Sequence, residues 1–140
     1  MAYPDNCLRG ISPPDGILDD GTVASHVFYF GKDVRPDGWL EQSINWEDDL
    51  EALPFTLAQK RRDGVTFQFP LGVAVVPRAH LDRLATLPAF AGRLSYERRA
   101  IDENPYHGHL TLRADTPEPT KRQIAATLAM HVATVAQRGP

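Results

Sequence analysis

The segment 107–114, HGHLTLRA, alternates cleanly between polar and apolar side chains. Successive side chains of a β-strand point to opposite faces, so this period of two predicts a strand. Four polar side chains would share one of its faces: His107, His109, Thr111 and Arg113. The other face would be apolar and carry Leu110, Leu112 and Ala114. A strand with one apolar and one polar face is typical of an antiparallel sheet that packs on helices from one side.

The C-terminal segment supplies such a helix. Four apolar residues recur there at helical spacing: Ile124, Leu128, Val132 and Val135. We expect an amphipathic helix of about five turns that is capped near Thr120 and ends at Gly139. Further apolar runs predict strands at 7–11, 22–30, 65–69, 72–76 and 93–97, and helical patterns predict helices at 45–53 and 78–87.

These patterns predict a single α+β domain over residues 1–140, with a mainly antiparallel sheet and the C-terminal amphipathic helix packed on one face. A chain of 140 residues has the usual size of one domain and can bury a core without disulfides. We find no internal repeat, no low-complexity tract and no linker that would divide it.

Charge and cysteine content exclude several classes of protein. The net charge of -3, with the densest basic runs short and confined to 60–62 and 98–99, argues against general nucleic-acid binding and against binding to anionic membranes. Cys7 is the one cysteine, so no intramolecular disulfide can form, and we expect it to be buried and inert. With no apolar run of membrane-spanning length and no signal-like N-terminus, we expect a cytoplasmic protein.

The polar face of segment 107–114 is the first candidate site. Imidazoles can exchange protons near neutral pH, and Arg and Thr can hold a phosphate. The sequence HLTL at 109–112 resembles the signature of the 2H phosphoesterases, in which two such motifs face each other across a cleft. The resemblance implies that His109 would be the acid or base and that Thr111 would bind phosphate. A solvated strand face explains the same residues, and a zinc ion held by His107 and His109 would have two of its usual three or four protein ligands.

The second candidate site involves Arg9 and Ser43. The segment CLRGISPPDGIL at 7–18 resembles the opening of many ADP-ribosyltransferase folds, where a strand bearing an Arg precedes a turn with prolines. Ser43 in EQSINW then corresponds to the Ser-containing strand. The resemblance implies that Arg9 and Ser43 hold a nicotinamide-bearing cofactor while a Glu orients its ribose, and Glu97 and Glu118 are single candidates for that Glu.

Every one of these polar clusters also has a structural explanation, and none completes a catalytic set. The sequence lacks a phosphate-binding loop, a dinucleotide-binding glycine motif and a nucleophile elbow. Our leading hypothesis is a small binding or accessory protein that recognises a protein partner or a small phosphate-bearing ligand. The alternatives are a hydrolase or transferase that acts on a phosphoester or nucleotide through the 107–113 face, and an ADP-ribosyltransferase-like enzyme. Cofactor, metal dependence and oligomeric state stay open.

Overall fold

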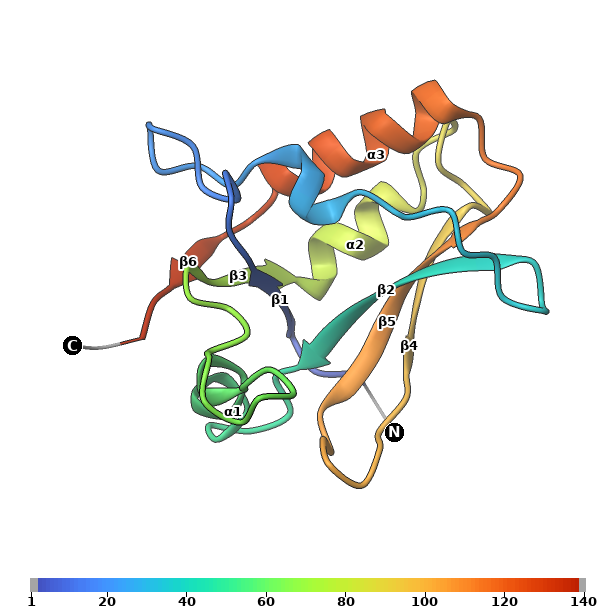
Figure 1. Cartoon of the computed structure of the whole chain (residues 1–140). Helices are drawn as coiled ribbons and strands as arrows, with labels where there is room; N and C mark the ends of the chain where they lie inside the picture. The colour runs from blue at the N-terminus through green and yellow to red at the C-terminus, as the bar shows by residue number, and fades with distance from the viewer. Residues whose placement is uncertain (1–2, 139–140) are drawn as a thin grey trace.

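A six-stranded antiparallel sheet forms the centre of the protein in the computed structural model, which describes residues 3–138 (Figure 1). Its strands are β1 (Asn6–Ile11), β2 (Trp39–Trp46), β3 (Gly72–Pro77), β4 (Leu94–Arg98), β5 (His107–Arg113) and β6 (Thr134–Ala136). They lie in the spatial order β4-β5-β2-β1-β3-β6. All neighbouring strands run antiparallel.

Helices cover both sides of this sheet. They are η1, a 3₁₀-helix (Ser25–Phe28), α1 (Ala52–Ala58), α2 (Arg78–Leu84) and α3 (Glu118–Met130). Helices α2 and α3 lie on one side of the sheet, where α3 packs against η1, and α1 lies on the other side (Figure 1). The main core lies under α3 and includes Phe28, Trp46, Leu110 and Ile124, whereas α1 covers a smaller cluster around Leu8. The expected α+β domain with a C-terminal helix packed on the sheet is confirmed.

The C-terminal helix is shorter than its apolar pattern predicts. Ile124 and Leu128 are fully buried in α3, as expected, but the helix ends at Met130 and Val135 belongs to β6. At the helix end, the His131 ring contacts the Thr127 carbonyl oxygen at 2.8 Å. The β-branched residues that follow then favour an edge strand, which pairs with β3. Gly139, where we expected the helix to end, lies outside the described residues.

Three other local predictions are wrong. Segment 22–30 contains η1 and no strand among its residues, because its apolar side chains are buried by packing on α3. Segment 65–69 makes only an isolated bridge, Lys60 to Phe67. Segment 45–53, predicted as a helix, holds the end of β2, a loop and only the first two residues of α1. In that loop Asp49 accepts a hydrogen bond from the Glu51 amide, and α1 starts directly after it at Ala52.

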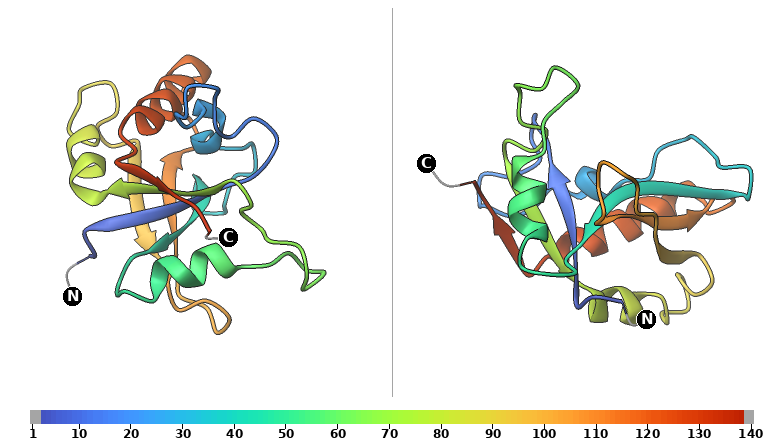
Figure 2. Two further views of the ribbon diagram at one scale, coloured as in Figure 1. Left: turned by 90° about the vertical axis from the view of Figure 1, so that its left-hand side faces the viewer. Right: turned by 90° about the horizontal axis from the view of Figure 1, so that it is seen from below.

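Strands β1 and β2 diverge soon after they meet, and this divergence positions the candidate site. They pair only at Cys7 with Trp46 and at Leu8 with Asn45. Strand β2 then continues along β5, while β1 continues along β3 as far as Ile11. The sheet therefore has two halves that separate from a shared corner (Figure 2). Arg9 and Gly10 of β1 are partly exposed along the gap, and Ser43 of β2 is exposed there.

Candidate functional site

The gap between β1 and β2 contains an arginine, Arg9, that has no acidic partner in the described part of the chain. Arg9, on β1, donates from Nε to the Val27 carbonyl oxygen at 2.9 Å and from Nη1 to the Ser43 carbonyl oxygen at 2.7 Å. Among residues 3–138, no carboxylate lies within ion-pair distance of this guanidinium. Burial lowers the pKa of Arg9 to about 10, because the charged form loses contact with water. The group remains a cation at neutral pH.

Arg9 lines an open hollow of about 480 Å³, which we call the arginine hollow. Its other lining residues are Gly10, Ser12, Pro13, Pro14, His26, Val27, Ser43, Gln68 and Phe69. The two residues that the sequence assigned to cofactor binding, Arg9 and Ser43, are thus brought together. The contact between them runs through the Ser43 backbone, and the exposed Ser43 side chain lines the hollow.

A second hollow of about 250 Å³ adjoins the first and shares four of its residues. We call it the amide hollow, because its lining includes Asn45, Gln59, Gln68 and Asn104. Asn45 donates to Thr56 Oγ1 at 2.8 Å and to Gln59 Oε1 at 3.0 Å, and it accepts from Asn104 Nδ2 at 2.8 Å. These bonds fix the amide floor of the hollow. His107 and Glu103 also line it.

Phe69 forms a wall common to both hollows. Its ring lies directly over Gly10, where an added Cβ would come within 2.1 Å of the ring. Gly10 is therefore needed for a close approach of ring and backbone. Phe69 remains partly exposed and lines both hollows, so part of its ring is accessible from each of them.

Basic side chains extend the arginine hollow at one end. Lys60, Arg61 and Arg62 line a third hollow, which shares Ser12 and Gln68 with the arginine hollow. All three side chains are exposed. The three adjoining hollows together form one cleft. It combines one partly buried guanidinium, a basic rim, an aromatic wall and a floor of amides.

The structure only partly brings together the four polar residues predicted on β5. His107 and His109 contact each other edge to face, with ring centroids 4.8 Å apart, as expected for residues on one face. Only His107 lines a described hollow of the cleft. Thr111 is 4% exposed, and Arg113 stacks over the Trp39 ring at 4.9 Å. His109 and Thr111 in the middle of the face are therefore covered, whereas the two ends, His107 and Arg113, stay accessible, and of these two His107 lines the cleft.

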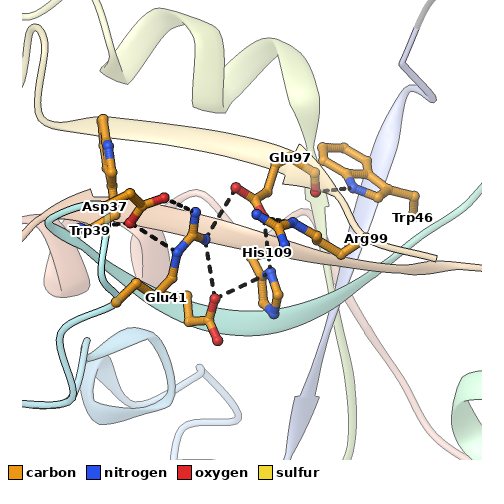
Figure 3. Close-up of polar contacts among 8 residues, drawn as sticks. Asp37, Trp39, Glu41, Trp46, Glu97, Arg99 and His109 are labelled. Carbon is orange, nitrogen blue, oxygen red and sulfur yellow. Dashed lines mark hydrogen bonds and ion pairs between the residues drawn. The ribbon is translucent and has the colours of Figure 1, made fainter. Parts of the chain in front are cut away.

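His109 is covered by a network of charged groups (Figure 3). Its Nδ1 lies 3.2 Å from Glu97 Oε2 and 3.5 Å from Glu41 Oε2. Glu97 also pairs with Arg35 at 3.2 Å and with Arg99 at 2.6 Å. Burial raises the pKa of Glu97, but the hydrogen bonds from His109 and Arg35 outweigh this effect and hold it below its usual value. Glu97 is therefore ionised at neutral pH, and its carboxylate is bound within this network and does not line the cleft.

The other predicted features lie away from the cleft. Cys7 is fully buried, and burial raises the pKa of its thiol to about 12, which makes it unreactive in the folded state. Glu118 binds Tyr29 at the start of α3. Within residues 3–138, no three His, Cys, Asp or Glu side chains are grouped to hold a metal ion. No helix in that range is long and apolar enough to cross a membrane.

Sequence reasoning did not assign segment 59–69 to a site, although this segment supplies Gln59, Gln68 and Phe69 to the cleft. No local sequence pattern indicates this role, because the role depends on how the segment folds over β1 and β2. Gly10 followed by a turn was the one hint that backbone and side chain meet closely there. Comparison with family models, with curated proteins and with solved structures finds no match to this chain.

Proposed function

We propose that this chain binds a small phosphate-bearing ligand in the cleft between β1 and β2. The observation that carries the proposal is the partly buried Arg9, a cation with two carbonyl partners and no carboxylate partner among residues 3–138. A charge that is partly shielded from water and has no counter-charge is costly, and a phosphate would supply the counter-charge. The planar guanidinium also suits the paired oxygens of a phosphate.

The rest of the cleft favours a ligand of nucleotide size. The Phe69 ring offers a flat surface on which a base could stack. The amides beside it, at Gln59 and Gln68, can donate to and accept from the polar edge of a heterocycle. The basic rim adds positive charge next to Arg9 and suits a ligand with more than one negative group.

ADP-ribosyl transfer from NAD is the second candidate, favoured by the contact between Arg9 and Ser43. Glu103, which lines the adjoining amide hollow, could accept a hydrogen bond from a ribose hydroxyl. In such a reaction the bond between ribose C1′ and nicotinamide breaks, and nicotinamide leaves with the bonding electrons. A water or acceptor hydroxyl bonds to C1′ and releases its proton to solvent. Glu97 and Glu118, the sequence-based choices for the Glu, are bound in other contacts.

Calorimetric titration of the full chain with inorganic phosphate, AMP, ADP and NAD tests the proposal. We expect saturable binding that Arg9→Met weakens at least tenfold, with the same substitution at exposed Arg83 on α2 as the matched control. Because Arg9→Met leaves two carbonyls without a donor, Ser43→Phe provides a second variant that fills the cleft from an exposed position. Absence of binding for all four compounds at millimolar concentration refutes the proposal. Release of nicotinamide from NAD tests the second candidate separately.

A further inference from the structure

The two histidines of β5 are neighbours, but only one can meet a ligand. His109 is 9% exposed, and its Nδ1 faces Glu97. His107 pairs in register with Asn45 and lines the amide hollow. The amide hollow shares Gly10 and Ser43 with the arginine hollow, so a ligand that reaches from Arg9 into the amides approaches His107.

Both positive and negative groups surround His107. His109 touches its ring edge to face, and Arg9 lies in the adjoining hollow. Glu41 on β2 and Glu103 in the amide hollow carry negative charge. Arg99, whose amide donates to the His107 carbonyl oxygen, has its side chain paired with Glu97. Burial and His109 lower the pKa of His107 while Glu41 opposes them, and the net shift is downward.

We propose that His107, which lines the amide hollow with its ring against His109, takes up a proton when a phosphate-bearing ligand enters the cleft. The inference rests on the proposed function. In the free protein the surroundings disfavour an imidazolium at position 107. A bound phosphate places a negative group in the same cleft and favours the charged ring. Protonated His107 and Arg9 would then hold the ligand from β5 and β1.

This coupling makes ligand affinity depend on pH in one direction. The pKa of His107 is higher in the complex than in the free protein, so affinity is greatest below the free value. It falls as pH rises from the free value to the bound value, by up to about tenfold per pH unit for one linked proton. A protein that holds phosphate through arginine alone would bind equally well across that range, because arginine does not titrate there.

The test is calorimetry of the full chain with 3′,5′-cyclic AMP and with NAD, whose phosphates do not change charge near neutral pH. Titrations at about pH 6.5 in two buffers of different ionisation enthalpy count the protons taken up, with an upper limit of roughly one for a single histidine. We expect net uptake in the wild type and none in His107→Gln. His109→Gln should raise the pKa of His107, because a neighbour that disfavours the charged ring is gone. The pH range over which binding takes up a proton should therefore move upward.

His80 on α2, which lines none of the three hollows, provides the control, and His26, which is exposed in the arginine hollow, is the competing proton acceptor. His80→Gln should leave the proton uptake unchanged. Binding without proton uptake, or uptake lost in His26→Gln and kept in His107→Gln, overturns the inference while the proposed function stands. Absence of binding for both compounds and for inorganic phosphate and ADP overturns both.

Discussion

Gly108, between the two histidines of β5, has no room for a side chain. A Cβ at this position would lie 2.4 Å from the Glu97 carbonyl oxygen and 2.4 Å from Trp46 Nε1. Trp46 donates to that same carbonyl at 3.1 Å, so the hydrogen bond crosses the space that the Cβ would occupy. We predict that Gly108→Ala destabilises the protein by displacing the fully buried Trp46 ring.

Two contributions determine how much stability Gly108→Ala should lose. Loss of the hydrogen bond costs about 1 kcal/mol. Overpacking at a buried position costs roughly 1–3 kcal/mol, because the Trp46 ring and the β4 backbone must move. The free energy of unfolding should therefore fall by about 2–4 kcal/mol, which lowers the Tm of a domain of this size by roughly 8–16 °C. The Trp46 ring also contacts Tyr3 and Tyr96 at centroid distances of 5.0 and 5.2 Å, so its near-UV circular dichroism should change.

Urea and thermal unfolding of Gly108→Ala measure the effect. Gly31→Ala is the matched control, because no heavy atom lies within 4 Å of its added Cβ, and its stability should stay within about 0.5 kcal/mol of the wild type. A Gly108→Ala protein with an unchanged Tm and an unchanged near-UV spectrum would refute the packing of Trp46 against β5 described above.

Three further predictions concern other parts of the structure. The Cys7 thiol should react with a thiol reagent only after unfolding, since it is fully buried; rapid reaction in the native state would contradict its position. Glu97, whose pKa is lower folded than unfolded, stabilises the protein above its ordinary value of 4.5 and loses this effect as pH falls below it. Wild type should therefore lose stability more steeply than Glu97→Gln in acid unfolding, and parallel curves would argue against the ion pairs. Asn45→Ala should cost about 1–3 kcal/mol by urea unfolding, because Thr56 and Asn104 lose their buried partner.

The elements predicted best are those with a regular period or strong boundaries. Alternation identified β5, and helical spacing located the part of α3 that contains Ile124 and Leu128. Segment 22–30 was mistaken for a strand because a continuous apolar run shows burial without showing backbone conformation. Strand β2 was hidden because Gln42 occupies a core-facing position, where it donates to the Phe28 carbonyl oxygen at 2.9 Å. That bond joins residues distant in sequence and cannot be inferred from local patterns.

The candidate site, like the fold, could be predicted only in part from the sequence. Residue type and position singled out Arg9, Ser43 and His107, but only the divergence of β1 and β2 brings them to one cleft. The Phe69 wall comes from a loop whose place over Gly10 depends on tertiary packing. Thr111 fits the histidine motif by spacing, yet strand pairing on both sides of β5 leaves it buried. Local sequence thus identified chemical groups, whereas accessibility was decided by the sheet.

The central claim is that a phosphate group meets the Arg9 guanidinium. Its most direct test is a nitrogen–proton correlation NMR spectrum of the labelled full chain during titration with ADP. We predict saturable shifts of the Arg9 Nε–H signal and of the Gly10 and Ser43 amides, with the Arg83 signal unchanged. A titration in which the Arg9 signal does not shift, or in which only signals of residues remote from the cleft shift, would contradict the account.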